Sequence, residues 1–167
     1  LEETTFEGYG PGGVAIIVES MTDNNNRTVA EVRHAFTRSG GNLGTDGSVS
    51  YLFIKKGLIQ IRSNSNLELA MEKAIEAGAE DIEENVDQSI TIFTLPEDFE
   101  SVKSSLYEAE IDIENSEVSL IPEISVSTDL ETSIKIFKLL EILEDLDDTQ
   151  NVHSNADFPK EIIEHID

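Results

Sequence analysis

The chain has 167 residues, and its 35 acidic against 11 basic side chains give a formal net charge of −24 at pH 7. That charge excludes binding of duplex nucleic acid by the whole surface, because each phosphate contact needs a cation. Hydrophobic residues make up 38%, too many for a disordered acidic tail, and the lack of cysteine excludes a disulfide framework, a thiolate metal site and a cysteine nucleophile.

No apolar run approaches the roughly 20 residues that a membrane span needs, and no signal peptide opens the chain, so we expect no membrane partner. The first residue is Leu1 rather than Met, which suggests a fragment of a longer protein.

The first elements predicted are a buried strand and an amphipathic helix. Five consecutive apolar residues at 14–18 follow an irregular glycine-rich lead-in at 7–13 and favour a strand. After a polar capping cluster, a helix is predicted over residues 27–39, and the glycines at 40–41 suit its end. Its apolar stripe, at helical spacing, consists of Val29, Val32 and Phe36.

Two strands are then predicted over residues 48–54 and 58–62, joined at Lys55, Lys56 and Gly57. A short basic turn that contains glycine is typical of a hairpin.

The acidic middle of the chain alternates helices and strands. We predict a helix over 67–77, a strand over 89–95, a helix from Pro96 and a strand over 117–126. A long helix over 129–146 and a short strand over 151–156 follow. The acids that close this helix are predicted to form a solvated helix end rather than a cation site; they are Glu144, Asp145, Asp147 and Asp148.

The order of these elements predicts an α+β fold with two domains. Residues 1–62 and 128–167 follow the split βαβ order of a ferredoxin-like sandwich, into which residues 63–127 insert a small αβαβ domain. The charge supports this division, because residues 1–62 carry a net −1, residues 63–127 a net −15 and residues 128–167 a net −8.

The sequence contains no complete motif for catalysis, a cofactor or a metal. The glycine-rich opening precedes a strand and lacks the Gly-Lys-Ser/Thr ending of a phosphate loop. The Asn-rich segment at 23–26 does not continue as a calcium loop, because Thr28 and His34 stand where Gly and Glu are needed. The histidines have no partner at metal-ligand spacing. We therefore expect a non-enzymatic protein with no cofactor, no metal and no small-molecule substrate.

One basic helix face remains as a candidate anion-binding surface. At 100° per residue, Arg27, His34 and Arg38 lie opposite the apolar stripe of the 27–39 helix, with Glu31 among them. The alternative, which the sequence leaves open, is an ordinary exposed face with an Arg27–Glu31 pair. The residues predicted to contact nucleic acid are Arg27, Arg33, His34, Arg38, Asn42, Lys55 and Lys56.

Several segments, in series along the whole chain, resemble the YebC/PmpR family. The segments that carry the resemblance are Glu7-Gly8-Tyr9-Gly10-Pro11-Gly12-Gly13, Thr22-Asp23-Asn24, Asn26-Arg27-Thr28, Glu31-Val32-Arg33-His34, Gly40-Gly41-Asn42-Leu43-Gly44, Gly47-Ser48-Val49, Glu76-Ala77-Gly78-Ala79-Glu80-Asp81, Leu143-Glu144-Asp145-Leu146-Asp147-Asp148, Gln150-Asn151-Val152 and Asn155-Ala156-Asp157. The family includes the mitochondrial translational activators of cytochrome c oxidase as distant relatives.

The resemblance implies a three-domain protein whose basic N-terminal helical domain is missing from this chain. It implies a non-enzymatic regulator of gene expression that binds DNA. The alternative within the family is a ribosome-associated translation factor that relieves stalling at difficult sequences such as proline runs.

A further alternative is an acidic protein-interaction module without nucleic acid contact. The expected partners are DNA or ribosomal RNA and ribosomal proteins. We expect a monomer in the cytoplasm, or in the mitochondrial matrix for an organelle homologue.

Overall fold

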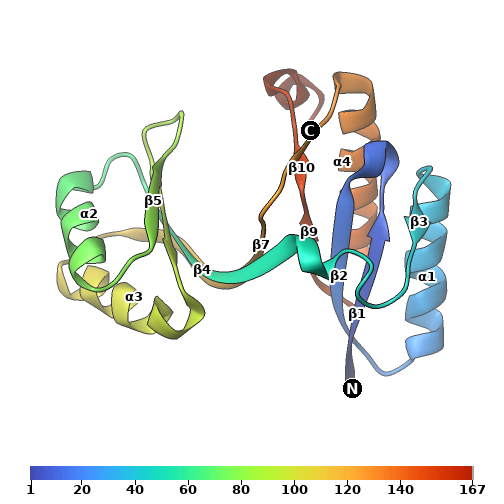
Figure 1. Cartoon of the computed structure of the whole chain (residues 1–167), viewed down its shortest axis with the longest axis horizontal. Helices are drawn as coiled ribbons and strands as arrows, with labels where there is room; N and C mark the ends of the chain where they lie inside the picture. Colours follow the sequence, from blue (N-terminus) through green and yellow to red (C-terminus); the bar gives the residue numbers. More distant parts are fainter. Residues whose placement is uncertain (167) are drawn as a thin grey trace. The chain divides into compact units, whose positions relative to one another are not determined.

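Two four-stranded sheets, each with its own pair of helices, make up the computed structural model, which describes residues 1–166 (Figure 1). The first unit contains Leu1–Ile54 and the chain from Pro122 onward, and the second contains Lys55–Ile121. The α+β class is thereby confirmed. The unit boundaries differ from the predicted 62/63 and 127/128, because strand β4 (Phe53–Ile61) pairs with a strand of the second unit.

The first unit contains an antiparallel four-stranded sheet in the order β3-β1-β2-β9. Two helices pack on one face of it, because Phe6, Ile16 and Val18 form a buried cluster with Phe36 and Leu139 from the helices. The bounds are β1 Glu2–Tyr9, β2 Ala15–Thr22, α1 Asn25–Arg38, β3 Asn42–Leu43, α4 Leu130–Asp145 and β9 Thr149–Ser154. Short pieces complete it: β8 Val126–Ser127 pairs with β10 Ala156–Asp157, and 3-10 turns span Pro11–Gly13, Ser50–Leu52 and Lys160–His165.

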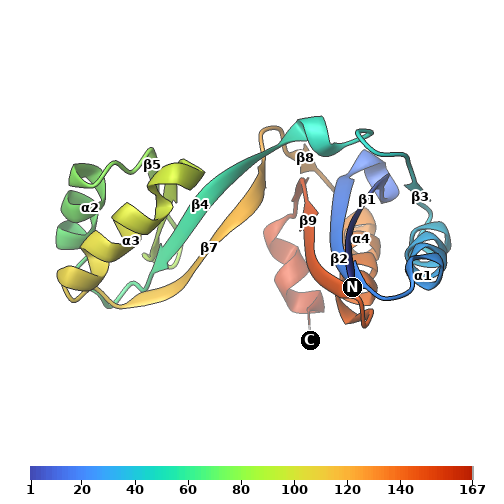
Figure 2. The same ribbon diagram turned by 90° about the horizontal axis from the view of Figure 1, so that it is seen from below.

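The second unit has a sheet in the order β5-β6-β4-β7, and β4 and β7 run side by side in Figure 2. Its core joins Ile59, Ile61 and Ile92 of the sheet to Val102 and Leu106 of a helix. The bounds are α2 Leu67–Glu76, β5 Asp81–Glu84, β6 Ile90–Thr94, a 3-10 turn Pro96–Asp98, α3 Phe99–Glu108 and β7 Ile113–Pro122. No helix among residues 1–166 is long and apolar enough to cross a membrane.

The predicted hairpin at Lys55-Lys56-Gly57 is wrong, because these residues lie inside the single strand β4. The glycine there serves close packing instead of a turn. Gly57 faces Thr94 of β6, and a Cβ at Gly57 would lie 2.1 Å from the hydroxyl oxygen of Thr94. A side chain at Gly57 would therefore collide with the side chains of Thr94 and Phe99.

Strands β1 and β5 are present although the sequence does not predict them. β1 has the sequence EETTFEGY and β5 has DIEE, so neither shows the apolar run or the full alternation that marks a strand. β7 begins and ends four residues before its predicted range of 117–126, and Pro122 is its last residue. These strands are fixed by pairing with their neighbours.

A buried carboxylate fixes the loop that follows β3. Glu7 of β1 alternates with Phe6, so its side chain lies on the sheet face away from the helices, and it is only 6% exposed. Its two oxygens accept backbone N–H groups from Gly47 at 2.7 Å, Val49 at 3.0 Å and Ser50 at 2.6 Å. Burial by itself raises the pKa of Glu7, but these hydrogen bonds outweigh it and leave the pKa below 4.5.

Replacing this carboxylate is expected to destabilise the first unit. Glu7→Gln puts an amide NH2 group against backbone donors, and we expect a loss of about 2 kcal/mol in the free energy of unfolding at pH 7. Because the folded-state pKa is lowered, the stabilisation by Glu7 is present above pH 4.5 and is lost as the pH falls through the folded value. Urea unfolding between pH 3 and 7 measures both effects.

The matched control is Glu3→Gln, since Glu3 lies on the same strand and is exposed. It should change the free energy of unfolding by less than about 0.5 kcal/mol. Equal losses for the two variants would show that the hydrogen bonds of Glu7 contribute nothing specific.

Candidate nucleic-acid interface

Helix α1, which carries the predicted basic face, begins at a side-chain cap. Asn24 accepts the backbone N–H of Arg27 at 3.1 Å through its side-chain oxygen, as an N-cap residue does. Val32, Ala35 and Phe36 point into the core. The opposite side of the helix is left to solvent.

One carboxylate joins the start of α1 to the end of α4. Asp148, in the turn after α4, accepts from Arg27 at 2.8 Å, from the Thr28 hydroxyl at 2.7 Å and from the Thr22 hydroxyl at 3.1 Å, all at one oxygen. Its backbone carbonyl accepts the N–H of Met21 at 2.9 Å. The hydrogen bond from Arg27, and after it that from Thr28, lowers the pKa of Asp148 below 3.8. The predicted solvated acidic helix end is therefore wrong for this residue, which is a structural acceptor.

This network removes Arg27 from the residues that are free to meet a ligand. The guanidinium of Arg27 also lies 3.3 Å from Asp23, so two carboxylates offset its charge. The hydrogen bond that Arg27 donates to Asp148 raises the pKa of Arg27. The Arg27–Glu31 pair that the sequence left open as an alternative is not formed. Arg27 pairs with Asp23 and with Asp148, which the turn between α4 and β9 places beside it.

A shallow hollow of about 440 Å³ lies where the end of α1 meets α4. Because Asp148 follows α4 and contacts the first turn of α1, the two helices are antiparallel, and the end of α1 lies beside residues 135–142 of α4. Lys135, Lys138 and Ile142 follow one another at helical spacing on one face of α4. We call this site the cationic hollow; it is lined by Arg38, Ser39, Gly40, Lys135, Lys138 and Ile142.

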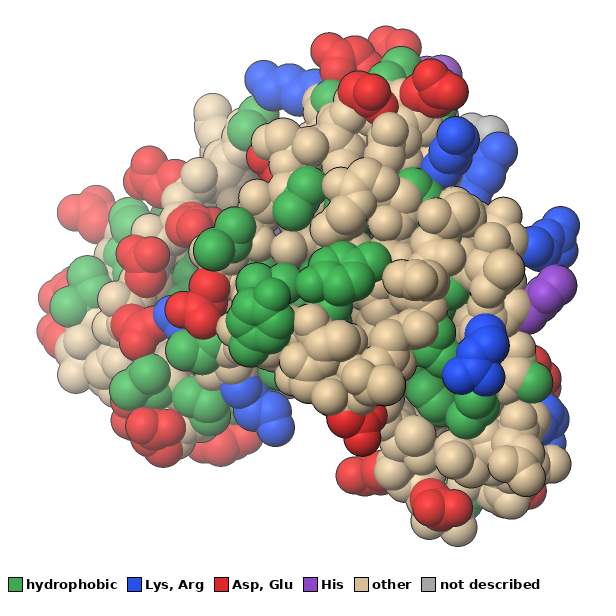
Figure 3. Space-filling model, turned by 45° about the vertical axis from the view of Figure 1, so that its right-hand side comes forward, with side chains coloured by type: hydrophobic (Ala, Val, Ile, Leu, Met, Phe, Trp, Pro, Cys, Tyr) green, Lys and Arg blue, Asp and Glu red, His purple; other side chains and the backbone are tan. Residues whose placement is uncertain are grey.

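The cationic hollow has three basic side chains and no acidic one among its lining residues. No salt bridge in the described part of the chain involves Arg38, Lys135 or Lys138. The charge of Lys135 does lower the pKa of Asp129, after the larger effect of hydrogen bonds from Thr132. Figure 3 shows Lys and Arg side chains, with a His among them, along the right-hand edge of one face. The hollow is thus a positive site on a strongly negative chain.

The other predicted contact residues are dispersed. Arg33 and His34 are exposed on α1, and Asn42 is exposed in β3, where it pairs with Tyr9. Lys55 and Lys56 belong to the second unit. Lys56 forms an ion pair with Glu80.

Sequence reasoning missed Lys135 and Lys138. Their three-residue spacing, outside the leucine stripe of α4, marks them only as two cations on a solvated helix face. That α1 places Arg38 next to them depends on the packing of the two helices.

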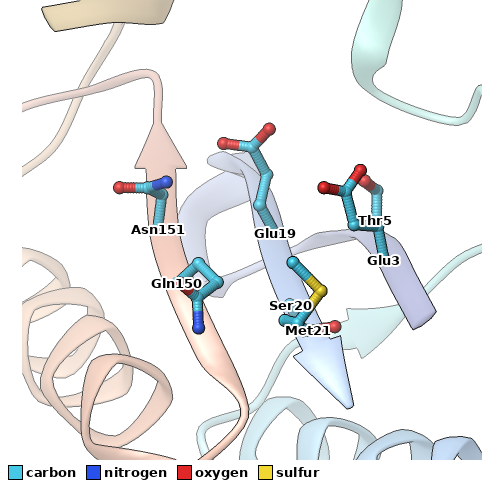
Figure 4. Close-up of a pocket in the computed structure, with 7 residues that line it drawn as sticks. All are labelled: Glu3, Thr5, Glu19, Ser20, Met21, Gln150 and Asn151. Atoms are coloured by element: carbon cyan, nitrogen blue, oxygen red, sulfur yellow. The ribbon is translucent and has the colours of Figure 1, made fainter. Parts of the chain in front are cut away.

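A second hollow, of about 270 Å³, lies on the β1-β2-β9 part of the first unit's sheet, and the charged side chains that line it are acidic instead of basic. Figure 4 shows Glu3 and Glu19 on neighbouring strands, with both carboxylates projecting to the same side of the sheet as Thr5. Glu19 also pairs with His153, with 2.6 Å between Oε1 and Nε2. These carboxylates disfavour a phosphate. Within residues 1–166, no group of three or more His, Cys, Asp or Glu side chains is arranged to hold a metal ion.

A family model, curated relatives and a solved structure each match most of this chain. The family model described as TACO1/YebC second and third domain matches residues 1–156. Proteins named probable transcriptional regulatory protein from Francisella tularensis (strain SCHU S4 / Schu 4) and Hahella chejuensis are each 55% identical, over 99% and 98% of this chain and 67% and 66% of their own length. The crystal structure of a conserved hypothetical protein from Aquifex aeolicus, Aq1575, is 47% identical with a TM-score of 0.86, and the match covers 97% of this chain and 67% of that one. The chain therefore spans about two thirds of these relatives.

Removing the carboxylate that joins α1 to α4 is expected to loosen the first turn of α1. Asp148→Ala leaves Arg27 and Thr28 without their shared acceptor, and we expect the Tm to fall by roughly 5 °C. Amide hydrogen exchange at Thr28 and its neighbours should become faster. Asp147→Ala, a change at an exposed neighbouring acid, is the control and should leave both measurements nearly unchanged. If the amides of α1 exchanged equally slowly in the two variants, Asp148 would not be the residue that holds the first turn of α1.

Proposed function

The chain belongs to the TACO1/YebC family, and on that basis we propose that it is a non-enzymatic, cytoplasmic regulator of gene expression that contacts the phosphate backbone of DNA through the cationic hollow. The names of its relatives support regulation of transcription, and the charge of the hollow supports the contact with nucleic acid.

The observation that carries the proposal is a cluster of three basic side chains on a chain of net charge −24. Arg38, Lys135 and Lys138 repel one another, and none of them is paired with a carboxylate in the described structure. Such a cluster is stabilised by an anion. The acidic remainder of the chain repels DNA, so it favours approach by this face alone.

The size of the cluster sets an expectation for the strength of binding. Three phosphate contacts on duplex DNA predict a slope of about −2.7 for the logarithm of the association constant against the logarithm of the salt concentration. Contacts of this kind fix the position of a protein on DNA and carry no sequence information. The hollow therefore supports backbone binding, and Arg33, His34 and Asn42 stay predicted contacts outside it.

A ribosome-associated translation factor is the second candidate. The basic residues of the hollow are Arg and Lys, which bind the phosphates of folded RNA as well as those of DNA, so the same site serves either candidate. The acidic protein-interaction module, which needs no nucleic acid, is an outcome of the test.

The test is a double substitution in the hollow, Arg38→Ala with Lys138→Ala. Removing two phosphate contacts should weaken binding of a mixed-sequence DNA duplex by at least tenfold and reduce the magnitude of the salt slope by about 1.8. Fluorescence anisotropy from 50 to 200 mM salt measures both. Ribosome co-sedimentation of the same proteins separates the two candidates.

Lys73→Ala with Lys103→Ala is the matched control, because it changes the net charge equally at cations of the second unit. Unchanged DNA affinity and slope in the hollow variant would overturn DNA binding through the hollow. If only ribosome binding depends on the hollow, the translation factor is supported. If neither DNA binding nor ribosome binding depends on the hollow, the protein-interaction module is supported.

A further inference from the structure

We infer that the cationic hollow seats a terminal phosphate of a nucleic acid, a phosphate monoester, in preference to an internal phosphodiester. The inference rests on the proposed function, the contact of the hollow with nucleic acid, and ranks a terminal phosphate above the backbone phosphates as the group bound there.

The charge of the hollow matches a monoester better than a diester. A terminal phosphate has a charge of about −1.5 to −2 at pH 7 and three strong acceptor oxygens, whereas a diester has a charge of −1. Arg38, Lys135 and Lys138 supply three positive charges to one site. Arg38 can bind two oxygens with its planar guanidinium, while each lysine acts as a point charge.

The shape of the site also favours a terminal phosphate over an internal one. Arg38 lies at the end of α1, and the two lysines lie on α4, so a bound group fits between two helices. A diester inside a duplex is joined to sugar on both sides and lies on a convex surface. A terminal phosphate is joined on one side and enters a concave site freely.

Binding in the hollow depends on side chains alone. The backbone N–H groups of Ser39, Gly40 and Gly41 bond to the carbonyls of Phe36 and Thr37, so none is left to donate to a phosphate. The negative end of the α1 dipole also opposes an anion here. The three cations must outweigh it, so the loss of any one should have a large effect.

An apolar residue completes the site. Ile142 lines the hollow and is 42% exposed. Together with the methylene stems of the lysines it offers an apolar wall to the terminal sugar and base. A phosphate that carries a nucleoside should therefore bind better than inorganic phosphate.

The experiment compares single-stranded 12-nucleotide DNA and RNA probes, each with a 5′-phosphate and with a 5′-hydroxyl, on the intact 167-residue chain. We expect the phosphorylated form of at least one of the two to bind about tenfold more tightly. The preference should fall to about one in Arg38→Ala and in Lys138→Ala. Lys160→Ala, an exposed cation outside the hollow, should keep it.

The outcomes separate this inference from the proposed function. Equal binding of both forms that still weakens in Arg38→Ala overturns the terminal-phosphate inference and leaves the proposed function in place. Equal binding that no variant weakens overturns both. A preference for the phosphorylated form that survives both substitutions places the phosphate elsewhere and overturns the inference. So does AMP binding as tightly as the phosphorylated probes, because the nucleic acid chain would then contribute nothing.

Discussion

The acceptor role of Asp148 is the interaction on which the candidate site depends. Its carboxylate accepts hydrogen bonds from Arg27 and from the hydroxyls of Thr22 and Thr28. It thereby fixes the first turn of α1 to the turn that follows α4. The cationic hollow begins at Arg38, eleven residues further along the helix, or about 16 Å at 1.5 Å per residue. Because α1 is a continuous helix, fixing its first turn also fixes the position of Arg38 at its end.

The far end of α1 is fixed by close backbone contact instead of by charge. A Cβ at Gly41 would lie 2.2 Å from the carbonyl oxygen of Tyr9, and one at Gly8 would lie 2.7 Å from that of Asn42. Only glycine permits this approach of β1 and β3 immediately after the helix. Together with Asp148, these contacts hold both ends of α1, so Arg38 has a defined position relative to α4.

The basic residues of this chain differ in whether a carboxylate offsets their charge. Arg27, Lys56, Arg62 and Lys73 each pair with a carboxylate, and of these only the pair of Arg27 belongs to a wider hydrogen-bond network, that of Asp148. The cations of the hollow have no such partner in the described structure and remain available to a ligand. Net charge describes the average of a surface, while binding depends on the local arrangement of its charges.

The sequence by itself determined the elements whose apolar residues repeat regularly: the strand after Gly13, α1 and α4, together with the family through its motifs. It could not determine β1 and β5, whose polar sequences form strands only beside a partner, or the continuous strand β4, where Gly57 serves packing. It indicated Arg38 through helical spacing, but tertiary structure alone decided that Lys135 and Lys138 lie beside it. The physical reason is that periodicity within a helix shows which side faces the core and says nothing about which other helix lies next to the exposed side.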